Sequence, residues 1–212
     1  NKKKHDKKYH TPTMIGEKWQ MDVKFVPQEC KVPQIISKNY FQYTVLDECN
    51  RKRFLYFTNE HSMYETSVAL RKAIEFFGYA PLILQTDNGW EFSDSVKHDD
   101  KAPTGRKYPN LLESMCIEFG IVHKFIRPRT PEHNGKVERS HRIDQDKFYR
   151  TLRFYSLDDL RKQGKVWNKK YNNMPKFVLK CKTPNEVELE LIDDFHRIRE
   201  EQGQKSLTSI ES

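Results

Sequence analysis

Three acidic residues, Asp22, Asp87 and Glu138, lie at positions where their carboxylates could act together. Carboxylate oxygens are the ligands that hard cations such as Mg²⁺ and Mn²⁺ prefer, and these ions leave coordination positions open for phosphate. Two ions about 3.5–4 Å apart can activate an attacking oxygen and stabilise the leaving one in an in-line displacement. The three residues therefore predict a divalent-metal site suited to phosphoryl transfer.

Two of these carboxylates are predicted to lie on strands. In residues 18–26 apolar residues alternate with polar ones, which is typical of a half-buried strand, and Asp22 faces away from the apolar side. Residues 82–86 form a short apolar strand after a predicted helix, which favours parallel pairing and leaves Asp87 at the carboxyl end of the strand. The alternatives are a surface aspartate at Asp22 and an ordinary Asp-Asn-Gly turn at Asp87.

The third carboxylate is predicted to lie on a helix that follows a basic loop. Pro128 and Pro131 keep the loop out of helical structure, and no helix breaker occurs from about His133 to residue 155. Glu138 shares one helix face with Arg142, two positions that are one helical turn apart. The alternative is a solvated helix face with ordinary ion pairs.

The charge of the chain is uneven. The 212 residues carry a net charge of +8, which favours a polyanionic partner. Basic residues gather in residues 1–8 and 122–142, whereas residues 182–201 are mainly acidic. The four cysteines show no C-x-x-C spacing, which indicates reduced thiols rather than a zinc site or a disulfide framework. No apolar run has the length of a membrane span, and the chain begins with Asn, as a fragment of a longer protein would.

The order of the predicted elements indicates a mixed α/β fold. Residues 40–46 and 54–58 are predicted to form a hairpin. Capping signatures at Ser62 and Asn110 predict two helices, and the first is closed by Gly78. A further strand is expected at 121–126, before the helix that carries Glu138. Strands and helices that alternate in this way form layers around one sheet.

Four motifs in this order resemble the integrase core domain. They are Trp19-Gln20-Met21-Asp22, Leu46-Asp47-x-x-x-Arg51, Gln85-Thr86-Asp87-Asn88-Gly89-Trp90-Glu91-Phe92 and His133-Asn134-Gly135-Lys136-Val137-Glu138-Arg139. This is the catalytic domain of retroviral integrases and of many bacterial insertion-sequence transposases of the DDE type. The later Trp167-Asn168-x-x-Tyr171-Asn172 and Lys182-Thr183-Pro184 are similar to the tail of the transposase branch, so the resemblance covers about residues 13–187.

The resemblance implies a ribonuclease-H-like fold with a mixed five-stranded sheet flanked by helices. It implies that Asp22, Asp87 and Glu138 bind two Mg²⁺ or Mn²⁺ ions. The implied chemistry is strand cleavage by water, followed by joining through a DNA 3′-hydroxyl. The expected partners are the DNA of the element ends and of the target, and further copies of the chain, with no small-molecule cofactor and no membrane. The expected location is the bacterial cytoplasm, in association with the nucleoid.

The resemblance also predicts the DNA contacts and the division of the chain. Phosphate contacts or stabilisation of developing charge are expected from Arg127, Arg129, Lys136 and Arg139. Further candidate DNA contacts are Arg142, His133 and Trp90, although His133 could be an ordinary surface histidine and Trp90 could pack against an insertion. The predicted divisions are a basic linker at 1–12, an integrase-type core at 13–155 with a loop insertion at 94–109, a helical extension at 156–192 and a polar tail at 193–212.

The sequence departs from the family pattern in two ways, and two alternative functions remain open. The interval between Asp87 and Glu138 is longer than in retroviral integrases, and the 94–109 loop accounts for the excess. Trp90 occupies a position where the family usually has a small residue. The alternative functions are a DNA-binding or assembly module that no longer cleaves, and a metal-dependent nuclease that hydrolyses DNA without joining it.

Overall fold

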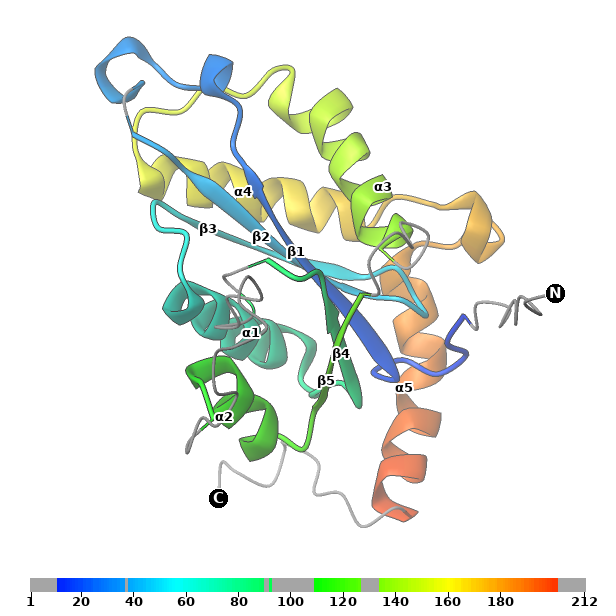
Figure 1. Ribbon diagram of the computed structural model, residues 1–212. Helices are drawn as coiled ribbons and strands as arrows, with labels where there is room; N and C mark the ends of the chain where they lie inside the picture. Colours follow the sequence, from blue (N-terminus) through cyan, green and yellow to red (C-terminus); the bar gives the residue numbers. More distant parts are fainter. Residues whose placement is uncertain (1–10, 37, 90–91, 93–108, 127–133, 202–212) are drawn as a thin grey trace, which may run out of the picture.

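A mixed five-stranded sheet forms the centre of the protein (Figure 1). The structure is a computed structural model, and it describes residues 11–36, 38–89, 92, 109–126 and 134–201. The strands are β1 (Lys18–Phe25), β2 (Phe41–Asp47), β3 (Arg53–Thr58), β4 (Ile83–Thr86) and β5 (Val122–Phe125). Their order is β3-β2-β1-β4-β5, so the first strand in sequence is the central one.

The sheet combines antiparallel and parallel pairing around β1. Strand β2 pairs antiparallel with both β1 and β3. The β2–β3 pair confirms the hairpin that is predicted for residues 40–46 and 54–58. Strands β1, β4 and β5 run parallel to one another. Helix α1 (Met63–Phe77) connects β3 to β4, and α2 (Leu111–Glu118) precedes β5, as the β-α-β reading of the sequence predicts.

The predicted caps begin and end the helices on one face of the sheet. The Ser62 side chain accepts a hydrogen bond from the backbone N–H of Glu65, and α1 ends at Gly78, whose φ of 77° suits glycine. Asn110 and Glu113 form a reciprocal capping box at the start of α2. Both helices cover the face of β1 that carries Trp19 and Met21, and together they form the larger core.

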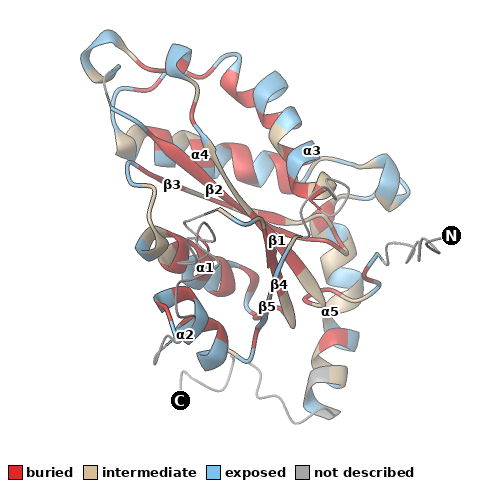
Figure 2. Cartoon of the chain, in the orientation of Figure 1, coloured by how far each residue is buried: buried red, intermediate tan, exposed pale blue. Residues whose placement is uncertain are grey.

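The opposite face is covered by two more helices (Figures 1 and 2). These are α3 (Gly135–Asp144), which continues into a π-helical turn, η4 (Gln145–Tyr149), and α4 (Leu157–Asn172). A second core lies here, in which Phe148 and Trp167 stack with ring centroids 5.6 Å apart. Because both faces are covered at this point, Gln20 on the polar side of β1 is fully buried, whereas the strand is only partly buried from Asp22 onward.

The last helix extends the fold beyond its predicted end. Helix α5 spans Pro184–Glu201, whereas the sequence places the start of a polar tail at residue 193. Phe195 is 2% exposed, and its ring centroid lies 4.7 Å from that of Tyr79. A Cβ on Gly16 would lie only 2.8 Å from the Phe195 ring, so glycine permits this close packing. One aromatic residue in an acidic, polar stretch gave too weak a signal for a core contact.

The described part of the chain also contains three short 3₁₀ turns, at Gln28–Cys30, Pro33–Ile35 and Phe177–Leu179. Within the residues that the structure describes, no helix has the length and apolar content required to cross a membrane. The predictions for residues 1–10, for most of the 94–109 insertion and for the loop 127–133 lie outside the described residues.

Candidate active site

Asp22 lies on β1, and Asp87 directly follows β4, the parallel neighbour of β1. The β1–β4 register pairs Lys18 with Ile83 and Gln20 with Gln85, and its continuation by two residues would align Asp22 with Asp87. Neighbouring strands lie about 4.8 Å apart, and residues in register point to the same face. Continued in this way, the register would direct both carboxylates to the same face of the sheet.

The two aspartates are anchored locally in different ways. The Asp87 side chain accepts a hydrogen bond from the backbone N–H of Gly89 at 2.9 Å, which is the geometry of an Asx turn. The Asp22 carboxylate accepts from the N–H of Val23 at 2.9 Å and is 18% exposed, so it remains accessible from solution. Asp87 thus belongs to a turn, as the Asp-Asn-Gly signal indicates, and it also lies at the strand end beside Asp22.

Glu138 approaches the aspartates from α3, which is fastened to β1. The backbone N–H of Val137 donates to Gln20 Oε1 at 2.9 Å, a buried contact in the first turn of the helix. Glu138 is exposed and lines an open depression of about 470 Å³ together with Arg139 and Arg142. Among the described residues, no three Asp, Glu, His or Cys side chains are close enough together to hold a metal ion. The structure therefore places Asp22 on β1, Asp87 directly after the adjacent β4, and Glu138 on a helix that packs against β1, and within the described part of the chain these three carboxylates form no metal-binding cluster.

His141 connects α3 to Asp22. Its Nδ1 lies 3.4 Å from Asp22 Oδ2, and its Nε2 lies 2.9 Å from Thr44 Oγ1 on β2. Burial lowers the pKa of His141 to about 4, although Asp144 acts in the opposite direction. The imidazole is therefore neutral at pH 7, and its contact with Asp22 is a dipolar one and not an ion pair. Glu138 lies three residues before His141 on α3, so this contact connects the helix that carries Glu138 to Asp22.

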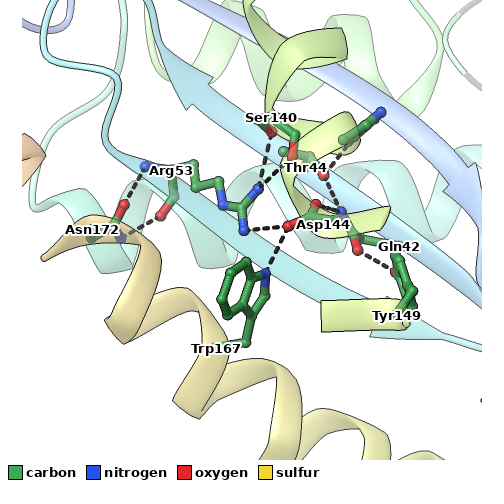
Figure 3. A network of polar contacts seen from close by, with 9 residues as sticks. Gln42, Thr44, Arg53, Ser140, Asp144, Tyr149, Trp167 and Asn172 are labelled. Atoms are coloured by element: carbon green, nitrogen blue, oxygen red, sulfur yellow. Dashed lines mark hydrogen bonds and ion pairs between the residues drawn. The ribbon is translucent and has the colours of Figure 1, made fainter. Parts of the chain in front are cut away.

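A buried ion pair holds α3 in this position (Figure 3). Arg53 of β3 and Asp144 of α3 are both fully buried, and Arg53 NH2 lies 2.6 Å from Asp144 Oδ1. The same carboxylate accepts hydrogen bonds from Trp167 Nε1 at 2.7 Å and from Gln42 Nε2 at 2.9 Å. The Arg53 guanidinium also donates to the Ser140 hydroxyl at 3.1 Å. A buried pair of charges is stabilised when its remaining hydrogen-bonding atoms have partners. Both Asp144 oxygens have them, whereas Arg53 Nε is buried without a hydrogen-bond partner in the part of the chain that the structure describes.

The same network fixes the end of α4. The backbone N–H of Arg53 donates to Asn172 Oδ1 at 3.0 Å, and Asn172 Nδ2 donates to the backbone carbonyl of Arg53 at 2.8 Å. The Arg53 guanidinium lies over the Tyr171 ring, with its central carbon 3.5 Å from the ring centroid. The sequence motif at 167–172 is thus structural, since Trp167, Tyr171 and Asn172 all contact either Arg53 or its partner Asp144.

Lys136 does not lie on the exposed surface that its predicted phosphate contact requires. Its ammonium group pairs with Glu48, whose fully buried side chain also lies 3.1 Å from Lys18 Nζ and accepts from Gln20 Nε2 at 2.9 Å. Burial lowers the pKa of Lys136, and the Glu48 carboxylate partly offsets this effect. Lys136 therefore ties the start of α3 to the sheet. The pairing was missed because Glu48 lies in a predicted hairpin turn, where an acidic residue is ordinarily exposed.

The other predicted DNA contacts divide into two groups. Arg139 and Arg142 are exposed beside Glu138, as a phosphate-binding role requires. The remaining four, Trp90, Arg127, Arg129 and His133, lie outside the described residues.

Asp47, which belongs to the second sequence motif, is a buried structural acid. It accepts hydrogen bonds from the backbone N–H groups of Gly16 at 2.6 Å and Cys49 at 2.8 Å, and from Trp19 Nε1 at 3.1 Å. Desolvation raises its pKa to about 6 in spite of these donors. Asp47 fixes the start of β1 and the hairpin turn, and it lies apart from the Asp22–Asp87 edge.

Comparison with known proteins gives consistent matches over most of the chain. The integrase core domain family matches residues 12–131, and a second integrase core domain family matches residues 119–184. An integrase, ORF3 of Spiroplasma virus SpV1-C74, is 32% identical in an alignment of 148 positions that covers 66% of this chain and 39% of the viral protein. A transposase of insertion sequence element IS5376 from Geobacillus stearothermophilus is 25% identical over 159 residues, 75% of this chain and 38% of the transposase. The chain thus spans about two fifths of the length of these relatives.

Solved structures share the fold. The HTLV-2 integrase catalytic core domain in complex with magnesium aligns with a TM-score of 0.58 and 20% identity, covering 82% of this chain and 97% of that one. The catalytic core domain of BIV integrase aligns with a TM-score of 0.59 and 18% identity, covering 85% and 99%. A chain of the simian T-cell lymphotropic virus intasome has a TM-score of 0.63 and 17% identity, covering 82% and 55%. The mixed sheet flanked by helices is therefore the ribonuclease-H-like fold, as the sequence predicts.

Proposed function

Because the chain belongs to the integrase core domain family, we propose that it is the catalytic core of a DDE-type transposase or integrase. Asp22, Asp87 and Glu138 are the proposed metal ligands. The observation that supports this proposal is the parallel β1–β4 register, whose continuation by two residues beyond Gln20 and Gln85 would align Asp22 with Asp87. The Asp22–His141 contact supports it, because it holds the helix that carries Glu138 against the same edge.

The chemistry of these three side chains fits Mg²⁺ or Mn²⁺. All three are carboxylates, which are hard oxygen donors, and Asp22 and Glu138 are accessible to an ion from solution. When bound, two such ions would activate the attacking oxygen and stabilise the leaving oxygen of a phosphodiester. The chain would use this chemistry to cleave a DNA strand with water and then to join DNA through a 3′-hydroxyl.

The surrounding residues have separate roles in this proposal. Neutral His141, whose other ring nitrogen contacts Thr44, orients the Asp22 carboxylate. Arg139 and Arg142, exposed beside Glu138, bind DNA phosphates and keep the strand next to the carboxylates. Lys136 acts indirectly, since its pairing with Glu48 fixes the first turn of α3. The protein is proposed to act as an oligomer on element-end and target DNA, since solved HTLV-2 catalytic cores are described as dimeric and trimeric.

The test is a cleavage and joining assay with Mn²⁺ and DNA that carries the ends of the parent element. Wild-type protein should give nicked and joined products, and Asp87→Asn should give neither while its circular dichroism spectrum is unchanged. Asp193→Asn, an exposed α5 position, is the matched control and should retain both activities. Near-normal activity of Asp87→Asn would remove this residue from the site. Nicked products without joined ones would instead indicate a nuclease of the same fold.

A further inference from the structure

A second hollow lies along β3, at the opposite edge of the sheet from β5. Its volume is about 1060 Å³, and its walls are formed by α1 on one side of the strand and α4 on the other. None of the three proposed metal ligands lines it. This hollow, here called the β3 groove, is therefore separate from the carboxylate edge.

The charged residues of the β3 groove all have the same sign. Of the described residues that line it, five are basic and none is acidic. The basic residues are Lys52, Lys72, Arg161, Lys165 and Lys169. Two of these contact carboxylates outside the groove: Lys52 pairs with Glu188, and Arg161 lies 3.7 Å from Asp158. The other three are exposed lysines, two from α4 and one from α1, so positive charge lines both walls.

The floor of the β3 groove is aromatic. Phe54 and Tyr56 of β3 and Phe76 of α1 line it, between the two basic walls. Phe76 is 41% exposed, and its ring centroid lies 5.3 Å from that of Phe54. The Tyr56 hydroxyl donates to Glu65 Oε2 at 2.7 Å, which leaves the ring fixed in the floor. Two of the cations lie over these rings: Lys52 Nζ is 5.1 Å from the Phe76 ring centroid, and the Arg161 guanidinium carbon is 5.6 Å from that of Tyr56. The groove thus combines aromatic rings and cations on one partly exposed surface.

We propose that the β3 groove binds single-stranded DNA. Proteins that hold single strands combine cations along the phosphate backbone with aromatic rings on which unpaired bases stack. A duplex presents its phosphates to a groove but keeps its bases stacked inside, so it would make no use of the aromatic floor. The proposal takes from the proposed function only that the protein acts on DNA, and it assigns the strand a contact surface away from the carboxylates.

A second copy of this chain fits the groove less well. Pairing of two copies through the same surface would bring the basic walls of both into contact, and like charges that face each other repel. The part of another copy that could still bind in the β3 groove is the acidic helix α5. This pairing would change the mass of the protein in the absence of DNA, so it can be recognised in the test.

Helix α4 supplies a matched pair of variants for this test. Lys165→Ala with Lys169→Ala removes two cations that line the groove. Lys162→Ala with Lys170→Ala removes two exposed lysines of the same helix that are not among its lining residues. Both double variants change the net charge and the helix propensity equally. Phe76→Ala tests the floor separately.

Binding of a fluorescent oligothymidine is measured by anisotropy in EDTA over a range of salt concentrations. The groove double variant should lower the log–log salt slope by about 0.7 for each lost phosphate contact, or about 1.4 in total. Phe76→Ala should weaken binding at least about fivefold, since stacking of one base contributes that much or more. The Lys162/Lys170 control should bind as wild type does. A duplex of the same length should show a smaller loss in the groove variants.

Three results would overturn the proposal: equal losses in the two double variants, a duplex affected as strongly as the single strand, or a change in oligomeric mass on groove substitution without DNA. The last result would assign the groove to another copy of the chain. Asp87→Asn should bind the oligonucleotide normally, because EDTA removes the metal from the measurement. Failure of the proposed metal site would therefore leave this binding intact, and failure of the groove would leave the cleavage assay interpretable.

Discussion

Substitution of Asp144 by Asn tests whether the buried network positions α3. The change keeps the shape of the side chain but removes the charge that neutralises Arg53, and both side chains are fully buried. Removal of one partner from a buried ion pair costs about 3–5 kcal/mol, because the remaining charge is left without compensation. A loss of this size is a large part of the total stability of a domain, which is about 5–15 kcal/mol.

The loss is measured by urea unfolding and by thermal melting. For a chain of this size, about 3–5 kcal/mol corresponds to a fall in Tm of roughly 6–20 °C. Hydrogen exchange should in addition rise first in α3, since Asp144 is its last residue. DNA cleavage should fall with it, because α3 carries Glu138.

Asp146→Asn is the control, since this exposed aspartate lies two residues further along. It should change stability by less than about 0.5 kcal/mol, as surface substitutions usually do. If Asp144→Asn loses no more stability than Asp146→Asn, the buried pair contributes little and the account of how α3 is positioned is incorrect. Normal stability with raised exchange in α3 alone would also contradict the expected cost.

Three further results are expected. Gly164→Ala should destabilise the protein by about 1–3 kcal/mol in urea unfolding, because its Cβ would lie 2.2 Å from the buried Phe57 ring; a gain in stability would mean that helix propensity outweighs this overlap. Asp47 has a folded pKa of about 6 against a reference of 3.8, so its contribution to stability is fully present below about pH 4 and is lost as pH rises through 6. Asp47→Asn should therefore lose less stability between pH 5 and 7 than wild type does, and equal changes would contradict the raised pKa. Mn²⁺ should raise the Tm of wild type more than that of Glu138→Gln, and the gain should fade as pH falls and the carboxylates bind protons; an equal shift in both proteins would exclude Glu138 from the metal site.

The local features of the fold could be predicted from the sequence because they depend on near neighbours. The alternation around Trp19 predicts β1, and the capping residues Ser62 and Asn110 predict the starts of α1 and α2. The position of Asp87 after a short apolar strand predicts the strand end at which the structure places it. These signals lie within a few residues of the feature that they predict.

The interactions that position the candidate site could not be predicted in this way, because they join distant parts of the chain. The Arg53–Asp144 pair connects residues that are 91 positions apart, and the Lys136–Glu48 pair spans 88. A lysine within a family motif, such as Lys136, has the same local sequence whether it binds phosphate or a buried glutamate. Only the packing of α3 on the sheet distinguishes the two roles, and it assigns Lys136 to Glu48.

The amide of Asn172 has a consequence for how copies of this protein can assemble. Strand β3 is an edge strand, and edge strands can pair with a strand from another chain through their unpaired backbone groups. At Arg53 the outward N–H and C=O are already bonded to Asn172, and the carbonyl of Phe57 accepts from Arg161 Nε at 2.9 Å. Addition of a foreign strand is therefore blocked at two positions along this edge. At the β3 edge, association of copies would therefore be made through side chains and not through a strand added to the sheet.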